Sequence, residues 1–311
     1  MRFLFLILVL FISACASVQT TFAENNVYLE YKKNHLNEPY FSIFDKDVEQ
    51  KTSQGILPIF KARNKDLVEL CPTCDWYSKK PTVAVLLARE GKDEYVITAD
   101  YVYALIKAGL NIRFISYDDM ERQTANVDAY FLPGGAFASK SDWFLTKSHE
   151  SFAKPGKRFR AYEFIINKAM RENKPLLGIC AGMQMMSAIV SNQQVKLYPD
   201  LDLITTISHH AKDRFVKAHP ILIEKNSKLY SYLKTKKIDV NSRHHVGVFK
   251  YSAEILPDTK VVASSPDGIT EAVEFVKYPN FLAVQFHPEV FAFQDDKKMQ
   301  AIFNGFRDMI K

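Results

Sequence analysis

Residues 175–184 have the residue types and the spacing of a catalytic turn. An apolar run ends in Gly-Ile-Cys-Ala-Gly at 178–182, and a helical pattern follows at once. A Gly-x-nucleophile-x-Gly turn between a strand and a helix presents its central side chain at the end of a sheet, because the glycines allow a sharp turn and close packing. The N-terminus of the following helix favours negative charge. The pattern therefore predicts Cys180 as a thiolate nucleophile.

A base for this thiol lies near the end of the chain. The apolar run at 281–286 leads into His287-Pro288-Glu289. The histidine can take the thiol proton and return it to a leaving group, and the carboxylate can hold the imidazole in the correct tautomer. A third apolar run, at 129–135, ends in Pro-Gly-Gly, whose backbone N–H groups can face an oxyanion. Together these segments predict an acyl-transfer site.

Each of these patterns also has an ordinary interpretation. A lone Gly-x-Cys-x-Gly is more often a tight turn with a buried thiol, and Pro-Gly-Gly alone is simply a turn. All three segments, however, follow expected strands. The carboxyl ends of strands are where the sites of open α/β sheets lie. We therefore expect the three segments to meet at one edge of a sheet.

The surrounding sequence alternates between strand and helix patterns, which is typical of βαβ units. Strands are expected at 82–88, 111–116, 127–132, 221–224, 238–240, 260–264 and 270–276, and helices at 95–107, 159–173, after the elbow at 182 and from about Asp296. The pattern predicts an α/β fold with a central, mostly parallel sheet flanked by helices.

From about Lys80 to the C-terminus, the chain resembles the class I glutamine amidotransferase-like family. The elbow and the His-Pro-Glu segment are typical of that family as a whole. Asn-Ser-Arg-His-His at 241–245 and Pro-Asp-Gly-Ile-Thr-Glu-Ala at 266–272 are similar to the γ-glutamyl hydrolase branch, which includes the bacterial γ-glutamyl-γ-aminobutyrate hydrolases. The resemblance implies a three-layer, flavodoxin-like fold.

The resemblance also implies roles for individual residues. It makes Cys180 the nucleophile, His287 the base and Glu289 the residue that orients the base. The backbone N–H groups of Gly135 and Ala181 are implied to form the oxyanion hole. Many hydrolases of this branch have an arginine where Ala181 stands, which bears on the identity of the substrate more than on the triad.

Three further residues are implied to bind substrate. Gln184 stands where the family often has a glutamine near the glutamyl group of the substrate. His244 and His245 lie in a segment that borders the pocket in the hydrolases.

The N-terminal residues 1–23 are typical of a secretory signal, with Met1-Arg2, a short apolar run and then small residues. Ile-Ser-Ala-Cys at 12–15 also resembles a bacterial lipoprotein box, in which Cys15 would carry the lipid. Ordinary cleavage after residue 23 is the alternative. Either way we expect an exported protein, in the periplasm or cell envelope, with attachment to a membrane in the lipidated case.

The cysteine count fits this location. With Cys15 lipidated and Cys71 paired with Cys74, Cys180 remains as the one free thiol. An exported compartment favours that disulfide. Cys71-Pro-Thr-Cys74 is also half of a zinc site or a redox motif, but no second Cys-x-x-Cys occurs and a helical pattern precedes it. We expect no metal site at these cysteines.

The remaining features are less informative. The adjacent His209 and His210 have no acidic partner pattern nearby, so we expect a surface pair rather than metal ligands, with contact to the substrate as the alternative. The formal charge of the 311 residues is +6. Basic and acidic residues are interspersed, which argues against a nucleic-acid surface. Residues 24–79 form a polar, aromatic-rich extension without an assigned function, and residues 80–311 form the expected hydrolase domain.

The sequence thus predicts an exported cysteine hydrolase that cleaves γ-glutamyl amide bonds through a thioester on Cys180, without a metal or cofactor. Expected substrates are small γ-glutamyl amines, γ-glutamyl peptides or cell-wall peptide fragments. One alternative is a non-catalytic surface lipoprotein that uses the fold for binding. Another is a glutaminase subunit that supplies ammonia to a separate synthase. We prefer the hydrolase because an exported protein has little ATP, and no ATP-binding or acceptor pattern follows the domain.

Overall fold

The structure is a computed structural model that describes residues 48–52, 55–63, 80–90, 94–134, 157–191, 201–203, 205–248 and 258–310. The chain divides into two compact units, Met1–Phe60 and Lys61–Lys311. In the first unit, β1 (Val48–Thr52) pairs antiparallel with β2 (Gly55–Arg63), a strand that extends past the boundary. The predicted signal with Cys15, and the predicted disulfide of Cys71 and Cys74, lie outside the described residues.

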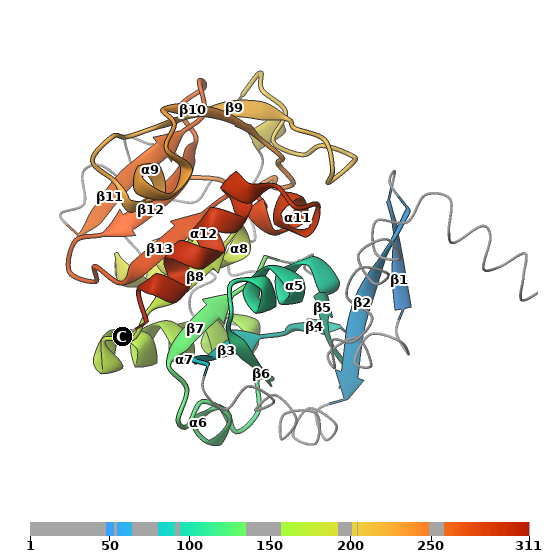
Figure 1. Cartoon of the computed structure of the whole chain (residues 1–311), viewed down its shortest axis with the longest axis vertical. Helices are drawn as coiled ribbons and strands as arrows, with labels where there is room; N and C mark the ends of the chain where they lie inside the picture. The colour runs from blue at the N-terminus through green and yellow to red at the C-terminus, as the bar shows by residue number, and fades with distance from the viewer. Residues whose placement is uncertain are drawn as a thin grey trace, which may run out of the picture. The chain divides into compact units, whose positions relative to one another are not determined.

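Nine strands of the second unit, within the described residues, form one sheet (Figure 1). They are β3 (Thr82–Leu86), β6 (Asn111–Ile115), β7 (Ala129–Leu132), β8 (Leu176–Ile179), β9 (His219–Ile223), β10 (Lys237–Val240), β11 (Thr259–Ser264), β12 (Thr270–Phe275) and β13 (Phe281–Val284). Their order is β10-β9-β11-β12-β13-β8-β7-β3-β6. The strands from β13 to β6 are parallel, and β12, β11, β9 and β10 continue the sheet with antiparallel pairing. Outside this nine-stranded sheet, β4 (Ala88–Glu90) pairs antiparallel with β5 (Glu94–Thr98).

Helices cover both faces of this sheet. The described helical elements of the unit are α5 (Ala99–Lys107), α6 (Met120–Gln123), α7 (Lys157–Glu172), α8 (Ala181–Val190), the 3-10 turn η4 (Leu201–Leu203), α9 (Lys228–Leu233), α11 (Pro288–Phe293) and α12 (Lys297–Asp308). Helices α5, α11 and α12 pack together on one face, and α7 packs against α8 on the other (Figure 1). The Asp296 side chain begins α12 by accepting hydrogen bonds from the N–H groups of Lys298 and Met299.

Alternation along the buried strands assigns side chains to the two faces. In β7, Tyr130 and Leu132 belong to the cluster that includes α7 and α8. Phe131, between them, turns to the opposite face, where its ring lies 6.4 Å from that of Phe303 in α12. The predicted α/β fold, a central sheet flanked by helices, is thereby confirmed.

One predicted element was partly wrong. Residues 95–107 were expected to form one helix, but the structure begins with strand β5 and starts α5 only at Ala99. Tyr95 and Ile97 are both buried, so the first part follows the two-residue period of a strand. Thr98 is extended (φ −79°, ψ 148°) and marks the change to helix. Across the described part of the chain, no helix is long and apolar enough to cross a bilayer.

Candidate active site

Cys180 stands at the sharp turn between β8 and α8. Its backbone has φ +52° and ψ −105°, a conformation that costs energy for any residue with a Cβ. Its N–H donates to the carbonyl of Val284 in β13, at 2.8 Å, and its carbonyl accepts from the N–H of Gln184, at 3.1 Å. The turn is therefore fixed to the neighbouring strand on one side and to the first helical turn on the other.

The glycines around the elbow are required by close packing. A Cβ on Gly178 would lie 2.9 Å from the backbone carbon of Gly182, and a Cβ on Gly182 would meet Leu132 at the end of β7. No real side chain tolerates such separations. The Gly-x-Cys-x-Gly spacing is therefore what allows α8 to begin directly against β7 and β8.

His287 and Glu289 follow β13, the parallel neighbour of β8. His287 precedes α11, and Glu289 lies in its first turn. The Nδ1 atom of His287 lies 2.6 Å from Oε1 of Glu289, whose side chain is completely buried. Burial lowers the pKa of His287, but the neighbouring Glu289 carboxylate and the Cys180 side chain outweigh it and raise that pKa to about 10. The structure thus brings the three predicted triad residues together.

Gly134, just beyond β7, lies between these groups. A Cβ there would be 3.0 Å from Cβ of Cys180 and 2.9 Å from Cε1 of His287. Its N–H donates to the phenol oxygen of Tyr101, at 3.1 Å. That N–H is therefore engaged, and Gly135, the predicted oxyanion donor, lies outside the described residues.

Tyr101 is a site residue that the sequence analysis missed. Its phenol oxygen, besides accepting from Gly134, lies 3.2 Å from Nδ1 of His287. Burial raises the pKa of Tyr101, and the nearby Glu289 and Asp100 charges add to that effect. The phenol is therefore protonated and neutral. It connects Gly134, just beyond β7, to His287.

A buried ion pair lies behind the triad. Arg214 pairs with Asp100, and one of its terminal nitrogens is 3.6 Å from Oε1 of Glu289. Asp100 also accepts from the N–H of Tyr101, at 3.0 Å. Burial raises the pKa of Asp100 while the Arg214 charge opposes that rise. The guanidinium thus balances two buried carboxylates, one of which orients His287.

Asn241 connects Arg214 to the backbone of His287. Its Oδ1 accepts from the backbone N–H of His287, at 3.1 Å, and its Nδ2 donates to the carbonyl of Arg214, at 2.9 Å. Asn241 belongs to the Asn-Ser-Arg-His-His segment that carried the resemblance. Arg214, Asp100 and Tyr101 had no comparable sequence signal.

The three residues predicted to bind substrate do not lie together. Gln184 is buried, and its amide donates to the carbonyl of Val246 and to Oε1 of Gln285. His245 is about half exposed, lies 3.3 Å from Asp202 and stacks on His210. His244 is buried elsewhere. His244 and His245 thus lie in different surroundings. Among the described residues, no hydrogen bond or ion pair joins either of them to Cys180, His287 or Glu289.

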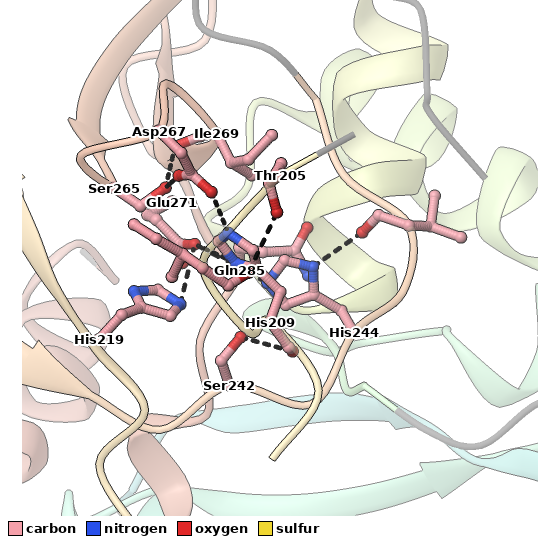
Figure 2. Close-up of polar contacts among 12 residues, drawn as sticks. Thr205, His209, His219, Ser242, His244, Ser265, Asp267, Ile269, Glu271 and Gln285 are labelled. Carbon is pink, nitrogen blue, oxygen red and sulfur yellow. Dashed lines mark hydrogen bonds and ion pairs between the residues drawn. The ribbon is translucent and has the colours of Figure 1, made fainter. Parts of the chain in front are cut away.

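His244 belongs to a second polar cluster, with His209, His219 and Glu271 (Figure 2). The predicted surface location of His209 is wrong, because its side chain is 0% exposed and its Nε2 lies 3.0 Å from Oδ2 of Asp267. The acidic partners are distant in sequence, on or just before β12, so no local pattern around His209 indicated them.

The chain is similar to several known proteins. A model of the Peptidase C26 family matches residues 83–289. Gamma-glutamyl-gamma-aminobutyrate hydrolase PuuD of Escherichia coli (strain K12) is 26% identical over 226 residues, which cover 67% of this chain and 85% of that protein. A glutamine amidotransferase-like protein of Rickettsia prowazekii (strain Madrid E), RP404, is 25% identical over 236 residues, covering 63% of this chain and 83% of its own.

Solved structures share the fold. The glutaminase domain of Trypanosoma brucei CTPS with bound acivicin has a TM-score of 0.53 at 18% identity, covering 75% of this chain and 95% of that one. PurLQS from Thermotoga maritima has a TM-score of 0.52 at 19% identity, covering 75% and 100%. At 18–19% sequence identity, these similarities establish that the chain shares the fold of both structures.

Proposed function

The chain belongs to the Peptidase C26 family, and we propose that it is a cysteine hydrolase that cleaves γ-glutamyl amide bonds through a thioester on Cys180. The observation that carries this proposal is the geometry of the three side chains. A strained cysteine at an elbow lies beside a histidine, since a Cβ on Gly134 would meet both side chains, and a buried carboxylate holds Nδ1 of that histidine at 2.6 Å. A purely binding role requires none of these three features.

The first half of the reaction forms the thioester. With a pKa of about 10, His287 is protonated near neutral pH, and it pairs with the thiolate of Cys180. The thiolate attacks the γ-carbonyl carbon of the substrate. The C–N bond then breaks as the imidazolium donates its proton to the leaving amine. A γ-glutamyl thioester and a neutral imidazole remain.

Backbone N–H groups are proposed to stabilise the oxyanion. Ala181 is the first residue of α8, and the first N–H groups of a helix have no partner within it. We therefore assign the N–H of Ala181 as the first oxyanion donor. Because Gly134 donates to Tyr101, we assign the second donor to Gly135. Loss of one such donor costs about 3–4 kcal/mol in comparable enzymes.

The second half of the reaction consumes water. Neutral His287 takes a proton from a water molecule as its oxygen attacks the thioester carbonyl. The C–S bond breaks, glutamate leaves, and the thiolate–imidazolium pair is restored. Glu289 supports both halves, because it keeps the Nδ1 proton of the histidine on the side away from the thiol.

The substrate class and the location rest on similarity and on the N-terminal sequence. The E. coli relative named as a γ-glutamyl-γ-aminobutyrate hydrolase supports a γ-glutamyl amide as the substrate. The signal-like residues 1–23 support export, with Cys15 lipidated in one version of the proposal. Export selects substrates outside the cytoplasm, among them γ-glutamyl amines and γ-glutamyl peptides.

A substrate panel tests the function. Purified protein would be incubated with γ-glutamyl-γ-aminobutyrate, a γ-glutamyl dipeptide, glutamine and, as a control, an α-glutamyl dipeptide. We expect glutamate from the γ-linked amides only, and a loss of at least about a thousandfold in Cys180→Ala. Ser187→Ala, a buried truncation further along α8, should retain activity. Release of glutamate from glutamine alone would favour the glutaminase alternative, and no release at all would contradict the hydrolase.

A further inference from the structure

The second polar cluster has an unusual property: its inner atoms have no hydrogen-bond partners. Within the described residues, Nδ1 of His209, Nε2 of His219, Nε2 of His244 and both carboxylate oxygens of Glu271 are buried and make no hydrogen bond. All four side chains are at least nine-tenths buried. Buried polar atoms are nearly always hydrogen-bonded in folded proteins, so a group of them facing one another requires an explanation.

The three imidazoles converge on the Glu271 carboxylate at ion-pair distances (Figure 2). Oε1 of Glu271 lies 3.4 Å from Nδ1 of His209, 3.6 Å from Nε2 of His219 and 3.8 Å from Nε2 of His244. An N–H···O hydrogen bond is usually about 2.7–3.2 Å long. All three separations exceed that range, and none of these nitrogens makes a hydrogen bond to Glu271.

In each histidine, the ring nitrogen that faces away from Glu271 (the outer nitrogen) has a partner of its own. That partner shows which nitrogen of the ring is available to a ligand. Nε2 of His209 lies 3.0 Å from the Asp267 carboxylate. Nδ1 of His244 lies 2.9 Å from the Val246 carbonyl, and Nδ1 of His219 lies 3.3 Å from the Pro220 carbonyl. These oxygens can only accept, so each outer nitrogen carries the proton. In the neutral rings, each inner nitrogen then directs a lone pair at the common centre, as in metal-binding histidines.

We propose that His209, His219, His244 and Glu271 bind a zinc ion in a closed, four-coordinate structural site. Zinc prefers tetrahedral sets of imidazole and carboxylate ligands, and sites that fill all four positions from the protein are structural. This proposal does not rest on the hydrolase activity.

The dimensions fit such an ion. Zinc bonds of about 2.0–2.1 Å place tetrahedral ligand atoms about 3.3–3.4 Å apart. The four ligand atoms all lie within 4.8 Å of one another, so the widest-spaced pair must draw together by about 1.5 Å at most. The four side chains come from the His209 segment, the start of β9, the segment after β10 and the strand β12.

The charges also balance. Three neutral imidazoles contribute no charge, and Glu271 and Asp267 together contribute two negative charges. A divalent ion makes the buried group neutral overall. Without an ion, the buried Glu271 carboxylate is balanced by imidazoles 3.4–3.8 Å away, which against the effect of burial lower its pKa to about 2. A divalent cation at the centre would supply this balance at bonding distance to Glu271 and to all three imidazoles.

An ion here would connect segments that support the triad. The N–H of His244 and the hydroxyl of Ser242 both donate to the carbonyl of His209, at 2.8 and 2.7 Å. Asn241, which holds the backbone of His287, precedes Ser242 directly. Binding of zinc would thus fix the segment from which Asn241 reaches the active site.

Metal analysis of the intact protein tests the proposal. The wild type, Glu271→Gln and His219→Ala would be purified without chelators and analysed for bound metal by mass spectrometry. His210→Ala is the matched control, since His210 adjoins His209 in sequence but stacks on His245 outside the cluster. We expect stoichiometric zinc in the wild type and the control, and its loss in the two cluster variants. Equal zinc in all four proteins would overturn the proposal.

A second measurement uses only folded wild-type protein and Asp267→Asn. After removal of metal by a chelator, the protein would be titrated with Co²⁺, whose four-coordinate complexes absorb strongly in the visible range. We expect that absorption, its displacement by Zn²⁺, a rise of the melting temperature with Zn²⁺, and an affinity about 10–100-fold weaker in Asp267→Asn. A wild type that shows neither the absorption nor the shift in melting temperature would show that the cluster is a metal-free polar network.

Discussion

The Nδ1 atom of His287 lies 2.6 Å from Oε1 of Glu289, a carboxylate with no exposed surface. A buried carboxylate at this distance does two things. It fixes the tautomer of the imidazole, and it raises the pKa of His287, with the help of Cys180, to about 10 despite the opposing effect of burial. Glu289, in the first turn of α11, therefore fixes the orientation of His287 and, together with Cys180, keeps it protonated.

This relationship predicts how stability depends on pH. The pKa of His287 is raised above its unfolded value of about 6.5, so the folded state binds the extra proton. The contribution of that proton to stability is fully present below about pH 6.5 and is lost as pH rises toward 10. Urea unfolding of the wild type should therefore show a free energy of unfolding that falls across this range. In His287→Ala the fall should be clearly smaller, and an unchanged slope in that variant would contradict the assignment.

Tyr101→Phe tests the phenol that joins Gly134 to His287. The change leaves a buried N–H of Gly134 without its acceptor, which typically costs about 1–3 kcal/mol. We expect kcat/KM to fall by about tenfold or more, while the protein remains folded. Tyr103→Phe, two residues along α5, removes a hydroxyl from a ring that stacks on Phe293 and is the control. Equal losses in both variants would indicate a general effect on α5.

Gly134→Ala should lower the catalytic activity more than the stability of the fold. The added Cβ would lie within 3.0 Å of Cys180, His287 and Tyr101, so these groups must move apart. A displacement of about 1 Å can cost about a hundredfold in rate. Gly305→Ala, whose Cβ would instead meet the ring of Tyr232, should lower the melting temperature but preserve kcat per folded molecule. Wild-type activity in Gly134→Ala would contradict the packing described for the elbow.

Arg214→Met should strongly destabilise the protein. The change leaves Asp100 and Glu289 buried without the guanidinium between them, and breaking a buried ion pair from one side costs about 3–5 kcal/mol. The double variant Asp100→Asn with Arg214→Met should regain part of that loss in denaturant unfolding. The exposed pair of Arg122 and Asp119 is the comparison, and Arg122→Met should cost about 1 kcal/mol at most. Similar costs at both arginines would refute the role of the buried pair.

The sequence predicted the elements that follow local patterns. The elbow, the His-Pro-Glu segment and the buried strands each occupy a few consecutive residues with a definite period or turn chemistry. Their convergence could also be predicted, because parallel strands place their carboxyl ends at one edge of a sheet. Cys180, His287 and Glu289 come together for this reason.

The supporting residues could not be predicted in the same way. Tyr101 and Asp100 lie where strand β5 gives way to α5, inside a segment whose apolar spacing also fits one continuous helix. Arg214 reaches Asp100 from 114 residues away. The buried cluster is more dispersed still, since His209, His219, His244 and Glu271 share no short spacing of the kind that marks a zinc motif. Only the antiparallel half of the sheet and its loops bring them together.

The most direct test of the central claim is to trap the acyl-enzyme. Wild-type protein would be mixed with a γ-glutamyl ester or amide, quenched in acid within the first turnovers, digested and analysed by mass spectrometry, with Cys180→Ala treated identically. We predict a γ-glutamyl group on the peptide that contains Cys180 in the wild type, and neither adduct nor glutamate release in Cys180→Ala. Glutamate release at an equal rate by both proteins, without an adduct on Cys180, would contradict the proposed mechanism.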